Sequence, residues 1–425
     1  MLWLTLARAA SPAPPTETLT LEDAVARLAA DSPVSAALAA QQAEARSAVT
    51  ASTARLLPTV ALQGRYVRNN AEAVAPIGSL FSLLPAIPPG VEVPGDLVIQ
   101  PLDQWLGTAT VDVPLVVPAA WADRGASQRG VRAAGAAGEA GGLQAEVALR
   151  SAAWMARAAE ETLEATRVGM ESARAHRDSA ARRRDAGLDT DLDVLQAEAE
   201  LLRREQLHEQ AVADLDAARR GLGAMLGVAG PVEIETGELP AAGEGTADLA
   251  SHPERRALEE RREAASKARL AARLQHLPSV AGFATATASS APFPTGQKTA
   301  WSVGAQARWV LFDGGARYAM SDRASAQIAA ADAELWKTDT ALSRRLQDAL
   351  EAERVAVVQL QLAEKGVEVA RAAEATSQRL FESGVGESLA TLDAQQRRME
   401  AEVGLAGARA RLAVSRIALE GLGAR

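Results

Sequence analysis

The 425-residue sequence contains no cysteine, which excludes disulfide bridges, thiolate metal sites and cysteine nucleophiles. It also lacks a phosphate-binding glycine loop, a serine nucleophile elbow and a recognisable catalytic triad. The few histidines show no spacing typical of metal ligands, and each is predicted to lie at the surface: His176, His208, His252 and His276. We therefore expect no metal, no cofactor and no enzymatic activity.

Basic and aromatic residues are scarce as well. The formal net charge is -9 and lysine occurs only at positions 267, 298, 337 and 365, so no basic face is available for nucleic acid. Aromatic residues make up 3% of a chain that is 48% hydrophobic, and much of that hydrophobic share is alanine. This composition favours long helices packed at close range over thick cores of large side chains.

Long hydrophobic runs are missing too. No segment after the N-terminus holds the roughly 20 apolar residues that a spanning helix needs, so any membrane crossing would have to use strands. Residues 1–18 begin with a short apolar run and an Ala-x-Ala pattern at positions 7–9. We interpret this segment as the remnant of a secretory signal, with a disordered N-terminus as the alternative.

The sequence contains an internal repeat, in which one unit occurs twice. Leu57–Val60 returns as Leu277–Val280, displaced by 220 positions, whereas Trp105 returns as Trp301, displaced by 196. The Ala-Gly pair that ends at Gly187 returns as a Ser-Gly pair, displaced by 197. The first copy therefore carries 24 extra residues between its two strands, in the proline-rich segment 71–104, which we expect to form a longer external loop.

Each copy predicts a helix, two strands, a very long helix, a short break and a further helix. Repeat 1 covers residues 19–226, residues 227–250 form a Gly-, Pro- and Glu-rich linker, and repeat 2 covers residues 251–425. About sixty uninterrupted helical residues make a rod on the order of 90 Å long, and mixed charges along it are typical of a solvated coiled coil. The helical patterns cover residues 21–56, 122–185, 188–226, 316–381 and 388–422.

Four strands are predicted, at about 59–70, 105–116, 279–289 and 300–311. Apolar and polar residues alternate in three of them, whereas the pattern is weaker in the third, which is mostly Ala, Thr and Gly. One apolar and one polar face over about ten residues is typical of a lipid-facing strand of a membrane barrel. The alternative is an ordinary strand of a β-sandwich. Four strands cannot close a membrane barrel, which needs at least about eight, so several subunits would have to share one. Aromatic side chains near the strand ends are predicted to lie at the membrane interfaces: Tyr66, Trp105, Trp301 and Trp309.

Taken together, these features resemble the TolC family of outer-membrane efflux proteins, over residues 19–422. The most specific element is the Leu-Phe-Asp-Gly-Gly run at 311–315, which closes a strand before a long helix. The equivalent stretch 114–118 has no glycine, so a different exit geometry is expected in the first copy.

The resemblance implies a mainly α fold with a small β part, assembled as a homotrimer. Four strands from each protomer would form a shared 12-stranded transmembrane β-barrel in the outer membrane, above an α-barrel tunnel in the periplasm. The partners would be a periplasmic adaptor (membrane fusion) protein and an inner-membrane transporter, in efflux or type I secretion, with lipid around the barrel. The alternative is a periplasmic coiled-coil structural or adaptor protein without a membrane barrel.

The resemblance also places the periplasmic tips of the tunnel at the helix breaks, with turns at Gly187, Gly384 and Gly386. Asp393 matches one of two pore-facing acids of the family, whereas Ala390 stands where the other would be. Phe381 and Gly386 replace a tyrosine and an arginine of the family's hydrogen-bonded latch.

In the first copy, acids cluster at the tip instead: Asp189, Asp191 and Asp193. Acids in a narrow three-fold ring would repel one another, raise each other's pKa and attract cations, so Asp393 and these three are the candidate constriction residues. The alternative is that Asp189 caps the following helix while the other acids are solvated.

Overall fold

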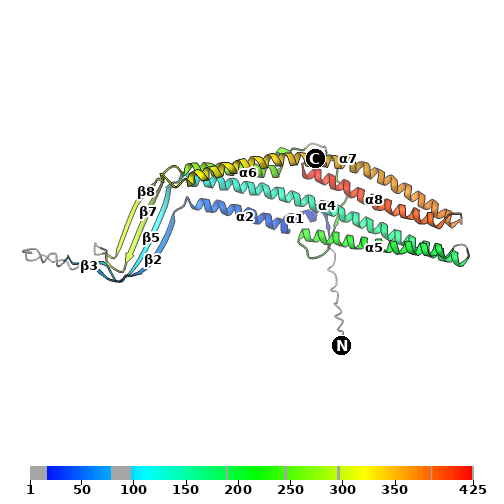
Figure 1. The fold of residues 1–425 in the computed structure, drawn as a ribbon, viewed down its shortest axis with the longest axis horizontal. Coiled ribbons are helices and arrows are strands. Elements are labelled where there is room, and N and C mark those ends of the chain that lie inside the picture. Colours follow the sequence, from blue (N-terminus) through cyan, green and yellow to red (C-terminus); the bar gives the residue numbers. More distant parts are fainter. Residues whose placement is uncertain are drawn as a thin grey trace, which may run out of the picture. The chain divides into compact units, whose positions relative to one another are not determined.

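The computed structural model describes residues 17–77, 97–187, 190–243, 247–293, 297–383 and 385–423 (Figure 1). The chain is mostly helical and divides into two compact units. Unit 1 comprises Met1–Ala43, Ala133–Glu259 and Ala333–Arg425, and unit 2 comprises Glu44–Arg132 and Glu260–Asp332. Four helices contribute residues to both units: Pro33–Ala54, Pro118–Asp185, Pro253–Leu274 and Ala316–Glu382.

The element order repeats within the chain. A helix, two paired strands and a helical hairpin occur first as α2, β2, β5, α4 and α5, and then as α6, β7, β8, α7 and α8. None of the helices in the described residues is both long and apolar enough to cross a membrane. The helices are α1 (Leu21–Asp31), α2 (Pro33–Ala54), α4 (Pro118–Asp185), α5 (Asp191–Leu226), a 3-10 helix (Leu249–Ser251), α6 (Pro253–Leu274), α7 (Ala316–Glu382) and α8 (Ser388–Gly421).

The first helical segment, predicted to be continuous, is broken at Ser32. Pro33 has no N–H to donate and starts α2, while Ser32 and Ser35 exchange side-chain and backbone hydrogen bonds of 3.0 Å across the break. Thr20 is the N-cap of α1, because its hydroxyl accepts a hydrogen bond from the backbone N–H of Asp23 at 3.1 Å.

The segment predicted to be a linker contains a strand that belongs to the core of unit 1. β6 (Val232–Glu235) pairs in parallel with β1 (Glu17–Thr20), which includes two residues assigned to the signal remnant. Val232 is fully buried and Ile234 is nearly so. Four residues with alternating burial are too short to stand out beside the surrounding Gly, Pro and Glu, which is why the sequence pattern missed them.

The core of unit 1 forms where α1, α4, α5 and β6 meet. Its buried residues are Ala24, Leu28, Leu149, Ala153, Ala156, Leu222, Leu226, Val232 and Ile234. A second cluster packs Trp154 of α4 against Ala413 and Ile417 of α8. Alanine supplies many of these contacts, as expected for helices that approach one another closely.

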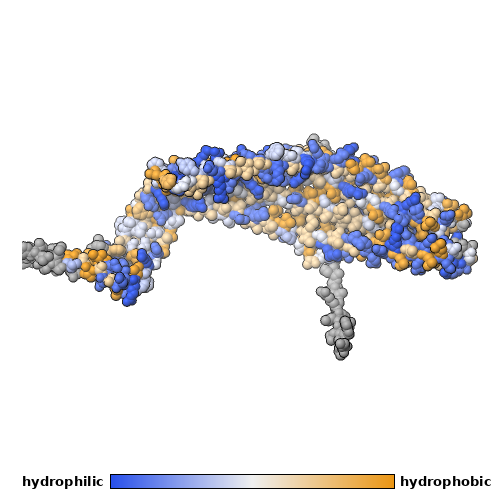
Figure 2. Space-filling model, viewed as in Figure 1, coloured by the Kyte–Doolittle hydropathy of each residue, from blue (hydrophilic) through white to orange (hydrophobic). Residues whose placement is uncertain are grey.

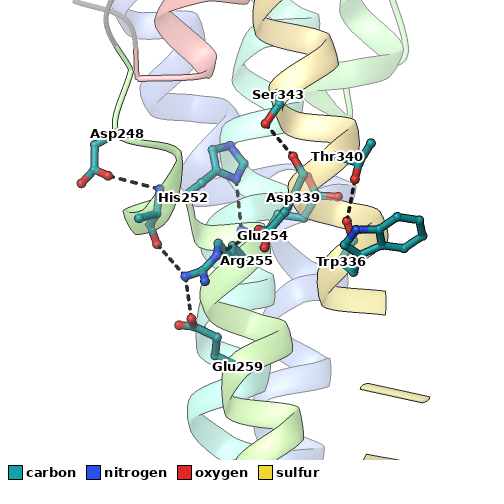
Figure 3. A network of polar contacts seen from close by, with 10 residues as sticks. Asp248, His252, Glu254, Arg255, Glu259, Trp336, Asp339, Thr340 and Ser343 are labelled. Carbon is teal, nitrogen blue, oxygen red and sulfur yellow. Dashed lines mark hydrogen bonds and ion pairs between the residues drawn. The ribbon is translucent and has the colours of Figure 1, made fainter. Parts of the chain in front are cut away.

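A polar network fixes the start of α6 against α7 within unit 1 (Figure 3). The Arg255 guanidinium donates to the carboxylates of Asp339 at 2.9 Å and Glu259 at 2.5 Å and to the carbonyl of Ala250 at 3.3 Å. Nδ1 of His252 accepts a hydrogen bond from the backbone N–H of Glu254, and burial lowers the pKa of this histidine. Both effects favour the neutral imidazole.

Unit 2 contains a four-stranded antiparallel sheet in the order β2-β5-β7-β8 (Figure 1). The strands are β2 (Thr59–Arg68), β5 (Asp103–Val116), β7 (Ser279–Ser289) and β8 (Thr299–Arg308). Two short strands, β3 (Ala73–Ala75) and β4 (Leu97–Gln100), pair at the two ends of the predicted external loop. The middle of that loop, residues 78–96, lies outside the described residues.

Candidate functional site

The register of the unit 2 sheet aligns the alternating residues of all four strands into two faces. Val60 lies opposite Val111, which lies opposite Ala284, which lies opposite Val303. The neighbouring row continues the same apolar face through Leu62, Ala109, Ala286 and Trp301. The opposite face is mostly polar and includes Gln63, Thr108, Thr110, Thr285, Thr287 and Ser302. The two-faced character predicted for separate strands is therefore a property of the whole sheet.

The apolar face is exposed within the described part of the chain. Leu62 is 86% exposed, Trp301 80% and Val303 70%, which is unusual for large hydrophobic side chains in a sheet. The outer strands β2 and β8 have a partner on one side only, so each presents a row of backbone N–H and C=O groups along its free edge.

Aromatic side chains lie at both ends of this sheet. Tyr66 and Trp105 are cross-strand partners with ring centroids 4.7 Å apart, and the Tyr66 hydroxyl donates to the Asp103 carboxylate at 2.6 Å. Trp309 directly follows β8 at the opposite end, and its indole N–H donates to the carbonyl of His276 at 3.0 Å. Trp301 lies within β8, opposite Ala286.

The Leu-Phe-Asp-Gly-Gly run is the joint between β8 and α7. Gly314 and Gly315 adopt φ angles of 70° and 91°, which residues with a side chain rarely adopt. The Asp313 carboxylate accepts hydrogen bonds from the backbone N–H of Arg317 at 3.2 Å and from its Nε at 2.8 Å. Burial alone would raise the pKa of Asp313, but these bonds lower it below its ordinary value. In the first copy α4 starts directly at Pro118, so the two exits differ as expected.

The first helix break lies between α4 and α5 in unit 1. Gly187 has φ of 76°, and its N–H donates to the carbonyl of Arg184 at 2.8 Å, which ends α4. Thr190 is the N-cap of α5 and forms a capping box with Asp193. Asp191 is 87% exposed and lies 3.8 Å from Arg184, while Asp189 lies outside the described residues. The N-cap of α5 is therefore Thr190, and not Asp189 as the alternative interpretation of the sequence had it.

Acidification is expected to loosen the start of α5. The hydroxyl and the backbone N–H of Thr190 donate to Asp193, and these bonds hold the pKa of Asp193 below its ordinary value of 3.8. The capping box therefore stabilises the turn fully above that pH and loses its contribution as the pH falls through the folded pKa. In the native protein, the hydrogen-exchange protection factors of the first-turn amides, which are corrected for the intrinsic effect of pH, should fall over this range. An Asp193→Asn variant should lack this step, and an equal step in the variant would contradict the assignment.

The second helix break lies between α7 and α8. The N–H groups of Val385 and Gly386 both donate to the carbonyl of Leu380, at 3.1 and 2.9 Å. A Cβ at position 386 would lie 2.7 Å from the backbone nitrogen of Phe381, so only glycine fits this turn. Gly384 lies outside the described residues. Asp393, one turn into α8, is 53% exposed and forms an ion pair of 2.8 Å with Arg397.

The two helical hairpins are joined near their tips by a cluster around Phe381, which is only 2% exposed. The His176 ring centroid lies 4.9 Å from that of Phe381, and the guanidinium of Arg183 lies 4.8 Å from the Phe381 ring centre. Nε2 of His176 also shares a hydrogen bond of 2.9 Å with the hydroxyl of Ser388. His176 is 4% exposed, so its predicted surface position is wrong.

A buried arginine is a second feature that the sequence did not reveal. Arg204 of α5 is 2% exposed, and it donates to Glu200 at 2.5 Å and to the sulfur of Met399 of α8 at 2.8 Å. Glu200 and Arg204 are spaced like an ordinary surface pair on a helix, so no sequence signal distinguished them. No group of three or more metal-ligating side chains occurs in the described ranges.

Comparison with known proteins relates the whole chain to one family. The model of the outer membrane efflux protein family matches residues 25–228 and 247–424. VceC of Vibrio cholerae is 18% identical, with a TM-score of 0.76 over 95% of this chain and 96% of VceC. CmeC of Campylobacter jejuni is 15% identical, with a TM-score of 0.79 over 98% of this chain and 90% of CmeC. Comparison with curated proteins finds no match.

The fold and the exposed surfaces define a duplicated protein that combines long helical hairpins with a small amphipathic sheet. The chain belongs to the outer membrane efflux protein family. Members of this family are passive channels, so this protein is an outer-membrane efflux channel subunit and not an enzyme. This result decides between the two functions considered from the sequence in favour of the channel.

Proposed function

We propose that three copies of the chain form one export duct, with a shared 12-stranded barrel in the outer membrane and a helical tunnel in the periplasm. The observation that carries this proposal is the exposed apolar face of a four-stranded sheet with two free edges. The order β2-β5-β7-β8 alternates direction, so β8 of one copy and β2 of the next are antiparallel when the sheets join. Three sheets of four strands give an even-numbered closed barrel.

The length of the sheet supports a membrane location. β7 has 11 residues, which span about 36 Å along the strand and about 25 Å in height when the strand is tilted by about 45°. This height matches the roughly 25 Å apolar band of outer-membrane barrels. Trp309 and the Tyr66–Trp105 pair at the two ends of the sheet would then lie at the two interfaces.

Exposed stripes on two helices of unit 1 support the oligomer. Val355, Val358, Leu362 and Val369 follow heptad spacing on α7, and Leu362 is 67% exposed. Leu192, Leu195 and Leu202 form a similar stripe on α5, with Leu195 66% exposed. Figure 2 shows apolar and hydrophilic residues interleaved on the visible face of the helical part. Neighbouring copies would cover both stripes and close the tunnel.

The partners and the tips follow from the same proposal. The duct supplies no energy, so an inner-membrane transporter must drive export, and a periplasmic adaptor protein would link it to the two helix tips. The turns at Gly187, Gly384 and Gly386 would form the periplasmic end. The candidate constriction residues remain Asp393, Asp193, Asp191 and Asp189.

The oligomer is tested by extracting the full-length protein from membranes with mild detergent and measuring its mass by light scattering. We expect a trimer that conducts ions after reconstitution into planar bilayers. A chain that stays soluble and monomeric without detergent would contradict both the shared barrel and the duct.

Ion selectivity is expected to depend on the Asp393–Arg397 pair. An Asp393→Ala change should lower the cation preference on the order of twofold, because it leaves the arginine charge unbalanced. An Arg397→Ala change should raise the cation preference, because it frees three carboxylates per trimer. Reversal potentials of single channels in a salt gradient measure both effects. Unchanged selectivity in both variants would place this pair away from the pore.

A further inference from the structure

A groove of about 730 Å³ lies beside β6 within unit 1 and has no role in the proposed duct. Its walls come from α4, β6, α7 and α8. Ala165, Val168, Ile234 and Leu405 give it an apolar part, while most of the rest of its lining is charged. Volumes of this size accommodate a short peptide or a comparable ligand.

One edge of β6 is free on the side of this groove. β6 pairs only with β1 in a two-stranded sheet, and residues 233–237 all line the groove. Among the described residues, no backbone hydrogen bond outside that sheet involves positions 232–237. Arg157 closes the end of the strand by donating to the Thr236 hydroxyl at 3.0 Å and to the carbonyl of Gly237 at 2.7 Å. Free strand edges of this kind bind extended peptides through their main chains.

The charges of the groove favour a basic occupant. Its lining contains six glutamates and four arginines. The arginines are already matched by carboxylates, as in Arg371–Glu402 at 2.9 Å and Arg409–Glu161 at 3.4 Å. Glu233 pairs with Arg219 at 2.7 Å, whereas Glu235 is exposed. The other glutamates of the lining are paired with arginines as well, so Glu235 is the carboxylate that the described part of the groove leaves for a basic ligand.

The alternation along β6 determines the spacing of the basic residues. Val232 and Ile234 face the core, so Glu233 and Glu235 share the opposite face of the strand. A strand added to the free edge would place every second side chain beside these two carboxylates. Its intervening side chains would lie toward Ala165, Val168 and Leu405 and should be apolar.

We propose that the free edge of β6 binds an extended segment of a partner protein in which basic and apolar residues alternate. The segment adds a third strand to the β1-β6 sheet and fills the groove. Main-chain hydrogen bonds hold it, and lysine or arginine at every second position pairs with Glu235 and Glu233. This interaction is separate from the helix tips and does not depend on the proposed duct.

The test uses the full-length protein in detergent and a fluorescent heptapeptide, acetyl-Thr-Lys-Val-Lys-Val-Lys-Thr-amide, with binding followed by anisotropy. Two control peptides are used. One has the same composition with its three lysines adjacent, and the other has the same sequence with alternate backbone amides N-methylated. Two protein variants carry the same charge change, Glu235→Lys in the groove and Glu209→Lys on α5. Single-channel conductance is measured in parallel.

We expect saturable binding that is at least tenfold weaker for both control peptides and for Glu235→Lys, and changed by less than twofold for Glu209→Lys. Conductance should be the same in both variants and in the native protein. Equal weakening by the two variants, or equal binding of the N-methylated peptide, would show diffuse charge attraction and overturn the proposal. Binding only after the oligomer is dissociated would assign the groove to a second copy of the chain and overturn it as well.

Discussion

Replacing Val303 with arginine is expected to abolish stable membrane assembly, whereas the same replacement at Ser302 should leave assembly intact. Val303 lies near the middle of β8 on the apolar face, opposite Ala284, and is 70% exposed. Ser302 is its neighbour on the polar face, opposite Thr285. The two variants therefore differ only in the face that receives the charge.

The size of the effect follows from lipid solvation. Arginine on the lipid face near the bilayer midplane costs about 2–4 kcal/mol per site. Three equivalent sites in a trimer would raise this cost to about 6–12 kcal/mol, which is comparable to the whole stability of a domain. On the polar face, the same guanidinium would meet water inside the barrel.

The measurement is the amount of trimer recovered from urea-washed outer membranes by a non-denaturing gel. We expect a trimer band for the native protein and Ser302→Arg and none for Val303→Arg. Loss only in Ser302→Arg would mean that the two faces are assigned the wrong way round. Normal assembly of both variants would show that neither face of the sheet contacts lipid.

The sheet was largely predictable because its information is local. Period-two alternation identified β2, β5 and β8, and the two-faced pattern needed only the register to become continuous. The glycines at 314 and 315 predicted a sharp turn between the strand and the next helix, because a double glycine after a strand indicates backbone conformations that other residues rarely adopt. Such signals require no knowledge of distant contacts.

The interior of unit 1 was not predictable in the same way. Whether His176 and Arg204 are buried depends on residues some 200 positions away, such as Phe381 and Met399, which pack on them. Within their own helices they are surrounded by charges and alanines that are typical of a solvated face. β6 was missed for a related reason, since its burial is provided by α1, α4 and α5.

A change of Phe381 to alanine is expected to loosen the junction between the two hairpins. Truncating a buried phenylalanine costs about 3–5 kcal/mol in protein cores, and here the change also removes the ring that contacts His176 and Arg183. Within the proposed duct, this cluster lies close to the periplasmic end. We therefore expect single-channel conductance to rise severalfold and the first thermal transition to move to lower temperature.

The matched control is Leu380→Ala, because Leu380 is the preceding residue but is 48% exposed. Its effect on both measurements should be small, since an exposed side chain loses little burial on truncation. A Phe381→Leu variant keeps most of the volume and should fall between the two, which separates loosening of the junction from general misfolding. If Phe381→Ala assembles as a trimer and conducts like the native channel, the cluster holds the hairpins together without controlling the opening.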